Sequence, residues 1–185
     1  MRGAELTTTC VASAFRRNIQ ILLLLVVCVP GAHADVIDRI MAVVSGQPIT
    51  LSDVTAAIQF HLVEAPSGTP DPLVYTADRL IERTLILAEV ERFQPPEPDP
   101  IEITTRIDAL ERRAGSTATF DTLLSVTGMT RDHLRRYIRD DLRITTYLNQ
   151  RFGANTPPNE REAAIKAWAS ELRKRAAVTV LTPAR

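Results

Sequence analysis

Cysteine is scarce in this chain: its 185 residues contain two, Cys10 and Cys28, and both lie within the first 34 positions. That leading stretch has the features of an export signal, so the exported chain would carry no cysteine. A domain without cysteine uses neither disulfide bonds nor thiol chemistry, and a domain of about 150 residues can be stable through packing alone. The 151 residues after position 34 therefore predict one domain with a sizeable core.

The chain also lacks an excess of charge of either sign. After position 34 it has 19 basic and 21 acidic side chains, a net charge of −2. Such a balance gives no reason to expect binding to nucleic acid or to an anionic membrane. Residues 131–143 are rich in arginine, and with Gly128 in the preceding turn they could form a helix-turn-helix. We expect a solvated face or the polar rim of a groove instead, because Asp132 and Asp140 stand at helical spacing from these arginines.

Groups that carry catalysis are missing as well. The exported part has two histidines, His61 and His133, and they lie on different predicted helices. Histidine, cysteine and carboxylate residues do not cluster at the spacing of metal ligands, and Glu89, Glu91 and Glu97 are expected on a solvated face. The chain has neither a glycine-rich phosphate loop nor a nucleophile elbow. We therefore expect no catalytic residue, no metal and no cofactor.

The N-terminus has the three parts of a secretory signal peptide. They are basic residues (Arg2, Arg16 and Arg17), an apolar run (residues 21–29) and small residues at the end (Ala32 and Ala34). We expect cleavage before Asp35, which divides the chain into a signal peptide, 1–34, and an exported, periplasmic domain, 35–185. The apolar run is shorter than the roughly 20 residues of a membrane helix, so a retained anchor is the less favoured alternative.

Apolar periodicity in the exported part predicts a mainly α fold. The expected elements are a strand at 37–44 with a hairpin turn at 45–48, helices at 51–62, about 77–90, 101–114, 119–126, 130–152 and 160–176, and a strand at 178–181. A proline-rich linker, 94–100, interrupts the helices. Because a lone terminal strand is marginal, we expect it to pair with the first strand. The predicted fold is a compact multi-helix domain with a small sheet, in which 35–152 is the N-terminal helical region and 160–181 the closing helix and strand.

Large apolar side chains beside loops are candidates for a binding surface. Phe60, Leu62 and Phe93 stand at predicted helix ends, and Met129, whose thioether is flexible, lies just before the helix capped by Thr130. Periodicity alone does not separate a binding surface from core, so both interpretations stay open for each of the four residues.

Residues 37–54 read IDRIMAVVSGQPITLSDV: a hydrophobic strand, a turn with glycine, and a helix entered through a hydroxyl residue. This segment resembles the opening of the exported chains of the SurA family of periplasmic chaperones. The helix around residues 80–83 and the stretch from Gly128 to Leu148 resemble the helices that follow in that family. The resemblance covers nearly all of residues 35–185, and its opening segment is the specific part.

Members of the SurA family usually carry parvulin-type prolyl isomerase domains between the long helix and the closing helix. The seven residues from Gly153 to Asn159 leave no room for such a domain. The resemblance thus implies the chaperone module alone: an ATP-independent holdase that binds unfolded segments of outer-membrane or secreted proteins. A structural adaptor that binds one folded envelope partner is the alternative. A peptidyl-prolyl isomerase follows from family membership only, since the chain offers no site for it.

Overall fold

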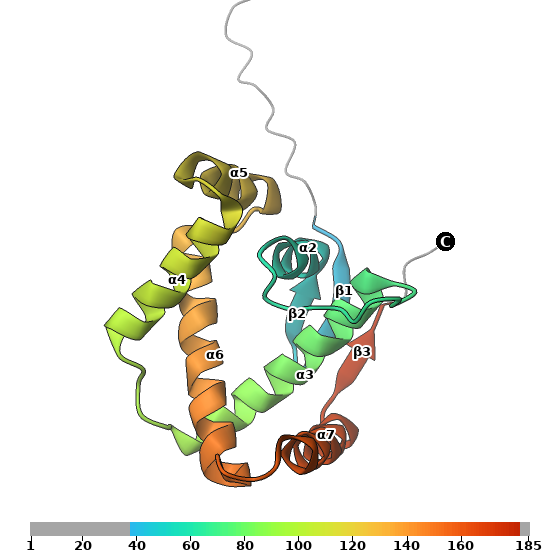
Figure 1. Cartoon of the computed structure of the whole chain (residues 1–185). Helices are drawn as coiled ribbons and strands as arrows, with labels where there is room; N and C mark the ends of the chain where they lie inside the picture. Colours follow the sequence, from blue (N-terminus) through green and yellow to red (C-terminus); the bar gives the residue numbers. More distant parts are fainter. Residues whose placement is uncertain (1–37, 182–185) are drawn as a thin grey trace, which may run out of the picture. The chain divides into compact units, whose positions relative to one another are not determined.

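A computed structural model of the chain describes residues 38–181, which form six helices and three strands (Figure 1). In chain order they are β1 Ile40–Val44, β2 Gln47–Thr50, α2 Leu51–Gln59, α3 Pro72–Phe93, α4 Pro100–Ala114, α5 Thr117–Thr127, α6 Arg131–Phe152, α7 Pro158–Arg175 and β3 Val178–Val180. The predicted fold class, mainly α with a small sheet, is confirmed. The expected signal peptide, 1–34, lies outside the described residues.

The three strands form one antiparallel sheet in the order β2-β1-β3. Ala42 lies opposite Ile49 of β2 and Val180 of β3, so the expected pairing of the terminal strand with the first strand is confirmed. Ser45 and Gly46 connect β1 to β2, and both have positive φ (49° and 88°), as the tight type I′ hairpin turn requires. The sheet therefore joins the two ends of the described domain.

A β-bulge alters the predicted alternation in β1. The pairing register with β2 shifts between Ile40 and Ala42, so Met41 is buried beside Ala42 while Ile40 is exposed. A bulge inserts one residue into a strand and changes the face to which the neighbouring side chains point. Ile40 is thus exposed, although Ala42 and Val44 of the same strand are buried.

Helix α2 begins at a capping box, close to the predicted start. The Thr50 hydroxyl accepts a hydrogen bond from the Asp53 N–H at 3.2 Å, and the Asp53 carboxylate accepts one from the Thr50 N–H at 2.8 Å. The helix ends at Gln59, three residues before the predicted end, because His61 takes a left-handed conformation with φ 51°. The Leu62 N–H then turns back to donate to the Ala57 carbonyl.

Helix α3 is the central element of the fold. It contacts α2, α6, α7 and the sheet, and Ile81 and Val90 are fully buried in it. The helix begins at Pro72, five residues before Ala77, the first residue of the predicted apolar stripe. Asp71 caps it by accepting hydrogen bonds from two backbone N–H groups, and proline at the first helical position completes a favourable start.

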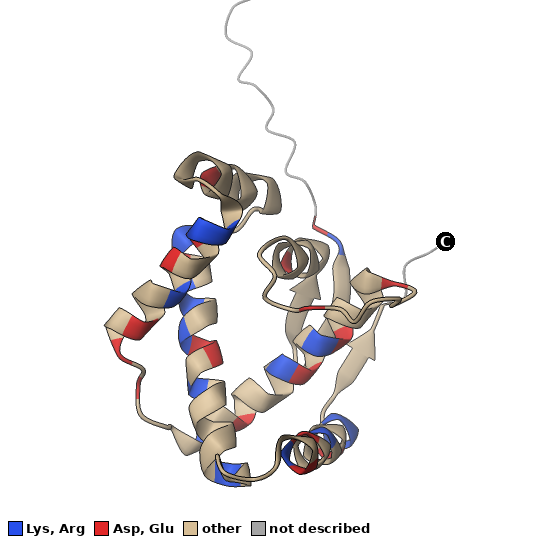
Figure 2. Ribbon diagram, in the orientation of Figure 1, with Lys and Arg blue, Asp and Glu red and all other residues tan. Residues whose placement is uncertain are grey.

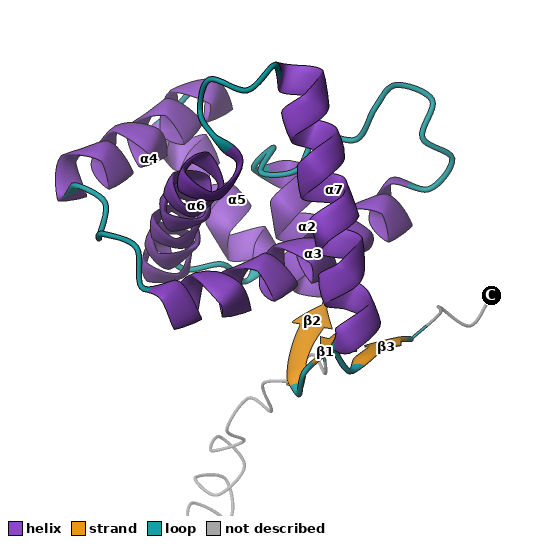
Figure 3. Ribbon diagram, turned by 90° about the horizontal axis from the view of Figure 1, so that it is seen from below, coloured by secondary structure: helices purple, strands orange, loops and turns teal. Residues whose placement is uncertain are grey.

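Two hydrophobic clusters hold the helices together, and α6 contributes to both. The larger one contains the sheet, α3, part of α2, and the C-terminal half of α6, with Leu172 from α7. The smaller one joins α4 and α5 to the N-terminal half of α6 and to Ala56 and Phe60 of α2. In Figure 3, α4, α5 and α6 lie on one side and α7 with the strands on the other.

Replacing Phe120 tests the smaller cluster. Phe120 belongs to α5, and its ring is fully buried and packs edge-on against the Phe60 ring at a centroid distance of 5.6 Å. Phe120→Ala removes this packing and leaves a cavity, so we expect the free energy of unfolding to fall by about 3 kcal/mol or more. Val126→Ala on the same helix is the control, since Val126 is 75% exposed. Denaturant titration followed by circular dichroism measures both; a similar loss in the two variants would contradict the assigned packing.

Candidate functional site

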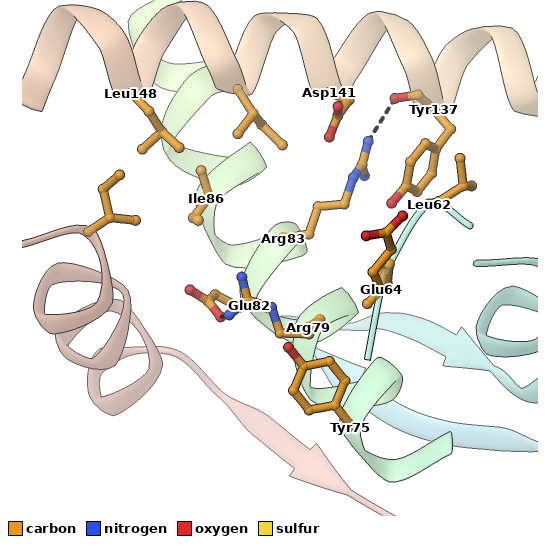
Figure 4. A pocket seen from close by; sticks show the side chains of 13 residues that line it. Leu62, Glu64, Tyr75, Arg79, Glu82, Arg83, Ile86, Tyr137, Asp141 and Leu148 are labelled. Carbon is orange, nitrogen blue, oxygen red and sulfur yellow. Dashed lines mark hydrogen bonds and ion pairs between the residues drawn. The ribbon is translucent and has the colours of Figure 1, made fainter. Parts of the chain in front are cut away.

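A cleft with a volume of about 330 Å³ opens between α3 and α6. The segment after α2 forms one end of it and Ile165 of α7 lines the other. Figure 4 shows its labelled side chains: Leu62, Glu64, Tyr75, Arg79, Glu82, Arg83, Ile86, Tyr137, Asp141 and Leu148. Apolar side chains, two tyrosines and charges of both signs therefore line one open depression.

A second cavity of about 170 Å³ adjoins this cleft. Leu62, Arg83 and Tyr137 line both spaces, while Met129 and Ile49 line only the smaller one. The shared side chains form the boundary between the two cavities.

Arg83 is held against Tyr137 by two contacts. Its guanidinium carbon lies 3.8 Å from the centre of the Tyr137 ring, and its Nη2 donates a 2.9 Å hydrogen bond to the Tyr137 carbonyl (Figure 4). The Nε of Arg83 is buried without a hydrogen-bond partner among the described residues. Burial raises the pKa of the Tyr137 hydroxyl, so this ring stays neutral and presents its face to the cation.

The four residues expected on a binding surface do not lie together. Leu62 and Met129 both line the smaller cavity, and their role in binding stays a prediction. Phe60 is 4% exposed and belongs to the smaller hydrophobic cluster, so the expectation that it is partly buried at a surface is wrong. Phe93 is 61% exposed but lines neither cavity. Phe60 is buried because α5 packs across the end of α2, a contact that the local pattern around Phe60 does not contain.

Sequence reasoning missed Tyr75, Tyr137 and Ile165, which line the larger cleft. Tyr137 directly precedes the buried residue Ile138, and Asp141 follows Tyr137 at a spacing of four, so Tyr137 and Asp141 both lie at the edge of the apolar stripe of α6. That position on a helix favours side chains that are half-buried at a groove. The sequence does not indicate that α3 is the helix facing Tyr137, because Arg83 lies 54 residues away from Tyr137 along the chain.

An aromatic cluster fixes α7 beside the cleft. Tyr147 lies between Phe93 and Trp168, with ring centres 5.4 Å and 5.9 Å away, and Phe152 lies 5.5 Å from Trp168. The guanidinium of Arg151 covers the Trp168 ring at 4.9 Å. These contacts join the ends of α3 and α6 to α7. They therefore place Ile165, one turn before Trp168, at the end of the cleft.

Ion pairs attach the proline-rich linker to α6. Arg139 donates two hydrogen bonds to Glu97, at 2.6 Å and 2.7 Å, and Arg143 pairs with Glu91 at the end of α3. Arg143 is only 3% exposed, so the prediction of a solvated arginine face is wrong for this residue. Glu91 and Glu97 are exposed, as expected of a solvated face, and both pair with Arg143. The hydrogen bonds from Arg139 lower the pKa of the Glu97 carboxyl.

The rest of the charged face of α6 follows the prediction in part. Figure 2 shows basic residues spaced along α6, with acidic residues among them. The expected pair of Asp140 with Arg143 forms, at 3.9 Å, whereas the pairs expected for Arg136 are absent from residues 38–181. Arg136 and Arg135 are exposed. Burial raises the pKa of the Asp140 carboxyl despite the arginines around it.

Comparison with protein-family models and with curated proteins finds no match to this chain. Among the described residues, no helix combines the length and the apolar character needed to cross a membrane. Histidine and acidic residues in 38–181 nowhere come together as a group of three or more that could hold a metal ion. These comparisons therefore assign no function to the cleft between α3 and α6.

Arg143→Ala tests the attachment of the linker. The substitution leaves Glu91 without a partner, takes one of its two arginines from Glu97 and opens space beside the core, so we expect the free energy of unfolding to fall by about 2 kcal/mol or more. This figure is below that of a fully buried pair, because both carboxylates are more than half exposed. Arg136→Ala is the control on the same helix and should change the free energy of unfolding by about 0.5 kcal/mol or less. Thermal unfolding measures both variants, and equal losses would show that the ion pairs of Arg143 contribute nothing to stability.

Proposed function

We propose that this protein is an exported, periplasmic holdase that binds unfolded segments of outer-membrane or secreted proteins without ATP. The observation that carries the proposal is the cleft between α3 and α6. Its volume falls in the range of about 300–1,000 Å³ that is usual for binding sites in proteins. It is open at the surface, so an extended chain can pass along it while one or two side chains enter.

The lining of the cleft suits clients of varied sequence. Leu62 and Val63 at one end and Leu148 and Ile165 at the other offer apolar area, while Tyr75 and Tyr137 combine ring surface with hydroxyl groups. Burial of apolar area drives such binding, and no nucleotide is needed for it. We expect weak affinity for each client, because the ordering of a flexible segment offsets much of the gain.

The opening of the domain supports the same proposal. The resemblance to the SurA family depends on the strand, turn and capped helix in residues 37–54, and β1, β2 and the capping box of α2 have that form. The connection from α6 to α7 consists of residues 153–157 alone. In this proposal, then, the protein acts by binding, without the isomerase step that relatives of that family carry out in a separate domain.

Suppression of aggregation tests the proposal. We expect the purified protein to reduce light scattering by a urea-unfolded outer-membrane protein on dilution, at near-stoichiometric amounts. Ile165→Ser removes apolar area from the cleft. It should raise the amount of protein needed to suppress aggregation by roughly twofold to threefold, because one half-buried aliphatic side chain is lost.

Ile101→Ser is the matched control, because Ile101 is 72% exposed on α4 and lines neither cavity. It should leave suppression unchanged. Equal effects of the two variants would show that clients do not bind in the cleft. If the unmodified protein suppresses no aggregation, the holdase function is excluded.

A further inference from the structure

Strand β3 forms one edge of the sheet, and alternate groups of its backbone point away from β1 (Figure 3). The two strands are antiparallel, and the Leu181 N–H donates a 2.9 Å hydrogen bond to the Met41 carbonyl. Successive residues of a strand turn their N–H and C=O groups to opposite sides. The backbone groups of Val178 and Val180 therefore point to the free edge.

The opposite edge of the sheet, formed by β2, lacks a donor at the corresponding place. Ser45 donates a 2.8 Å hydrogen bond to the Ala177 carbonyl, so the backbone of Val43, two residues earlier, also turns toward β3. Pro48 lies opposite Val43 in β2, and its backbone therefore turns to the free edge. Proline has no N–H to donate, and it is one of the residues that protect sheet edges from pairing with a further strand. Of the two edges, β3 is thus the one that offers both donors and acceptors.

The side chains at the β3 edge are apolar and exposed. Val180 is 51% exposed, and Leu181, directly after the strand, is 42% exposed. Val180 lies opposite the fully buried Ala42, so both side chains point to the face of the sheet that packs on the core. Residues 38–181 cover this face at Ala42 and leave Val180 half exposed. An apolar side chain on an added strand would cover the rest of Val180.

The short length of β3 decides between a second copy of this chain and an unfolded segment as the occupant. The strand has three residues. Stable interfaces between folded proteins involve roughly 20–30 residues on each side, so pairing of β3 with β3 of a second copy is too small to hold a dimer. An unfolded segment can extend along the edge, and its backbone matches the alternating donors and acceptors whatever its sequence.

We propose that the free edge of β3 binds an extended client segment as a fourth strand of the sheet. This inference rests on the proposed function and adds a second contact for the same clients outside the cleft. Hydrogen bonds to the backbone of Val178 and Val180 hold any extended segment, and the uncovered side of Val180 favours segments with apolar residues at alternate positions. Strands of outer-membrane proteins, the proposed clients, have this alternation.

Three fluorescein-labelled peptides test the strand pairing by fluorescence anisotropy. They share one sequence, in which Val and Thr alternate between two terminal Glu residues. The first is unmodified, the second is N-methylated at every Val, and the third at every Thr. An added strand turns only alternate N–H groups toward β3. Methylation of one set should therefore weaken binding by about tenfold, and methylation of the other set should change it by less than about twofold.

Amide hydrogen exchange, followed by NMR spectroscopy of the isotope-labelled protein, locates the contact. At saturation, the unmodified peptide should slow exchange of the Val178 and Val180 N–H groups by about fivefold or more, because both gain an acceptor. The Leu181 N–H already donates to Met41 and should change less.

Two substitutions at one position separate the backbone donor from the side chain. Val180→Pro removes the outward N–H and no hydrogen bond between β1 and β3, so it should weaken binding of the unmodified peptide by about tenfold. Val180→Thr is the control, since it keeps the N–H and the branched shape, and it should stay within about threefold of the unmodified protein. Exchange of the Leu181 N–H reports whether β3 remains paired in each variant.

Equal binding of the two methylated peptides, or slowed exchange in the cleft alone, would overturn strand addition and leave the holdase intact. Exchange at Val178 and Val180 that slows with protein concentration, without peptide, would overturn the client in favour of a second copy. A peptide that binds nowhere would overturn the inference, whereas the holdase fails only if the protein also suppresses no aggregation.

Discussion

Helix α6 changes its packing partners within three residues, and the architecture depends on this change. Leu142 belongs to the smaller hydrophobic cluster, whereas Ile144 and Tyr147 belong to the larger one. Arg143 stands between them, buried, and pairs with carboxylates at the end of α3 and in the linker. A charged group at this position stays buried only while its partners remain in place, because an unpaired buried charge is costly. The pairs at Arg143 thus couple the α3–α4 linker to the point where the two clusters meet.

The cleft follows from the same arrangement. Because α6 is fixed to the α4–α5 pair on one side and to α3 on the other, the faces of α3 and α6 that diverge beside Arg83 remain uncovered. The aromatic contacts of Trp168 then hold α7 across one end of this space. Its walls come from helices that pack in the two hydrophobic clusters, and half-buried Leu62 lies at its boundary with the smaller cavity, which Met129 lines.

The sequence predicted the elements whose signals are local. Thr50, Thr130 and the glycines after α4, α5 and α6 mark helix ends through backbone hydrogen bonds within a few residues, and the structure has these ends near the predicted positions. The terminal strand was also predictable, since a lone strand needs a partner and one apolar strand was available. The early end of α2 was not, because it depends on the left-handed conformation of His61.

The site was less predictable, because its side chains come from segments far apart in the chain. The burial of Phe60 by α5, and of Arg143 by Glu91 and Glu97, depends on how helices cross. Helical periodicity gives the face of each helix but not the partner that the face meets. Leu62 and Met129 were candidates because they stand beside loops, whereas Tyr137 and Arg83 line the cleft only because α3 and α6 approach each other.

Site-specific crosslinking in living cells tests the central claim most directly, namely that the cleft holds many unfolded clients. A photoreactive amino acid replaces Ile165 in the cleft, and in a second strain it replaces Val126, which is exposed on α5 and lines neither cavity. After irradiation, captured proteins are identified by mass spectrometry. The account predicts many different exported polypeptides at position 165 and few at position 126. Capture of a single folded envelope protein at position 165, or the same proteins at both positions, would contradict it.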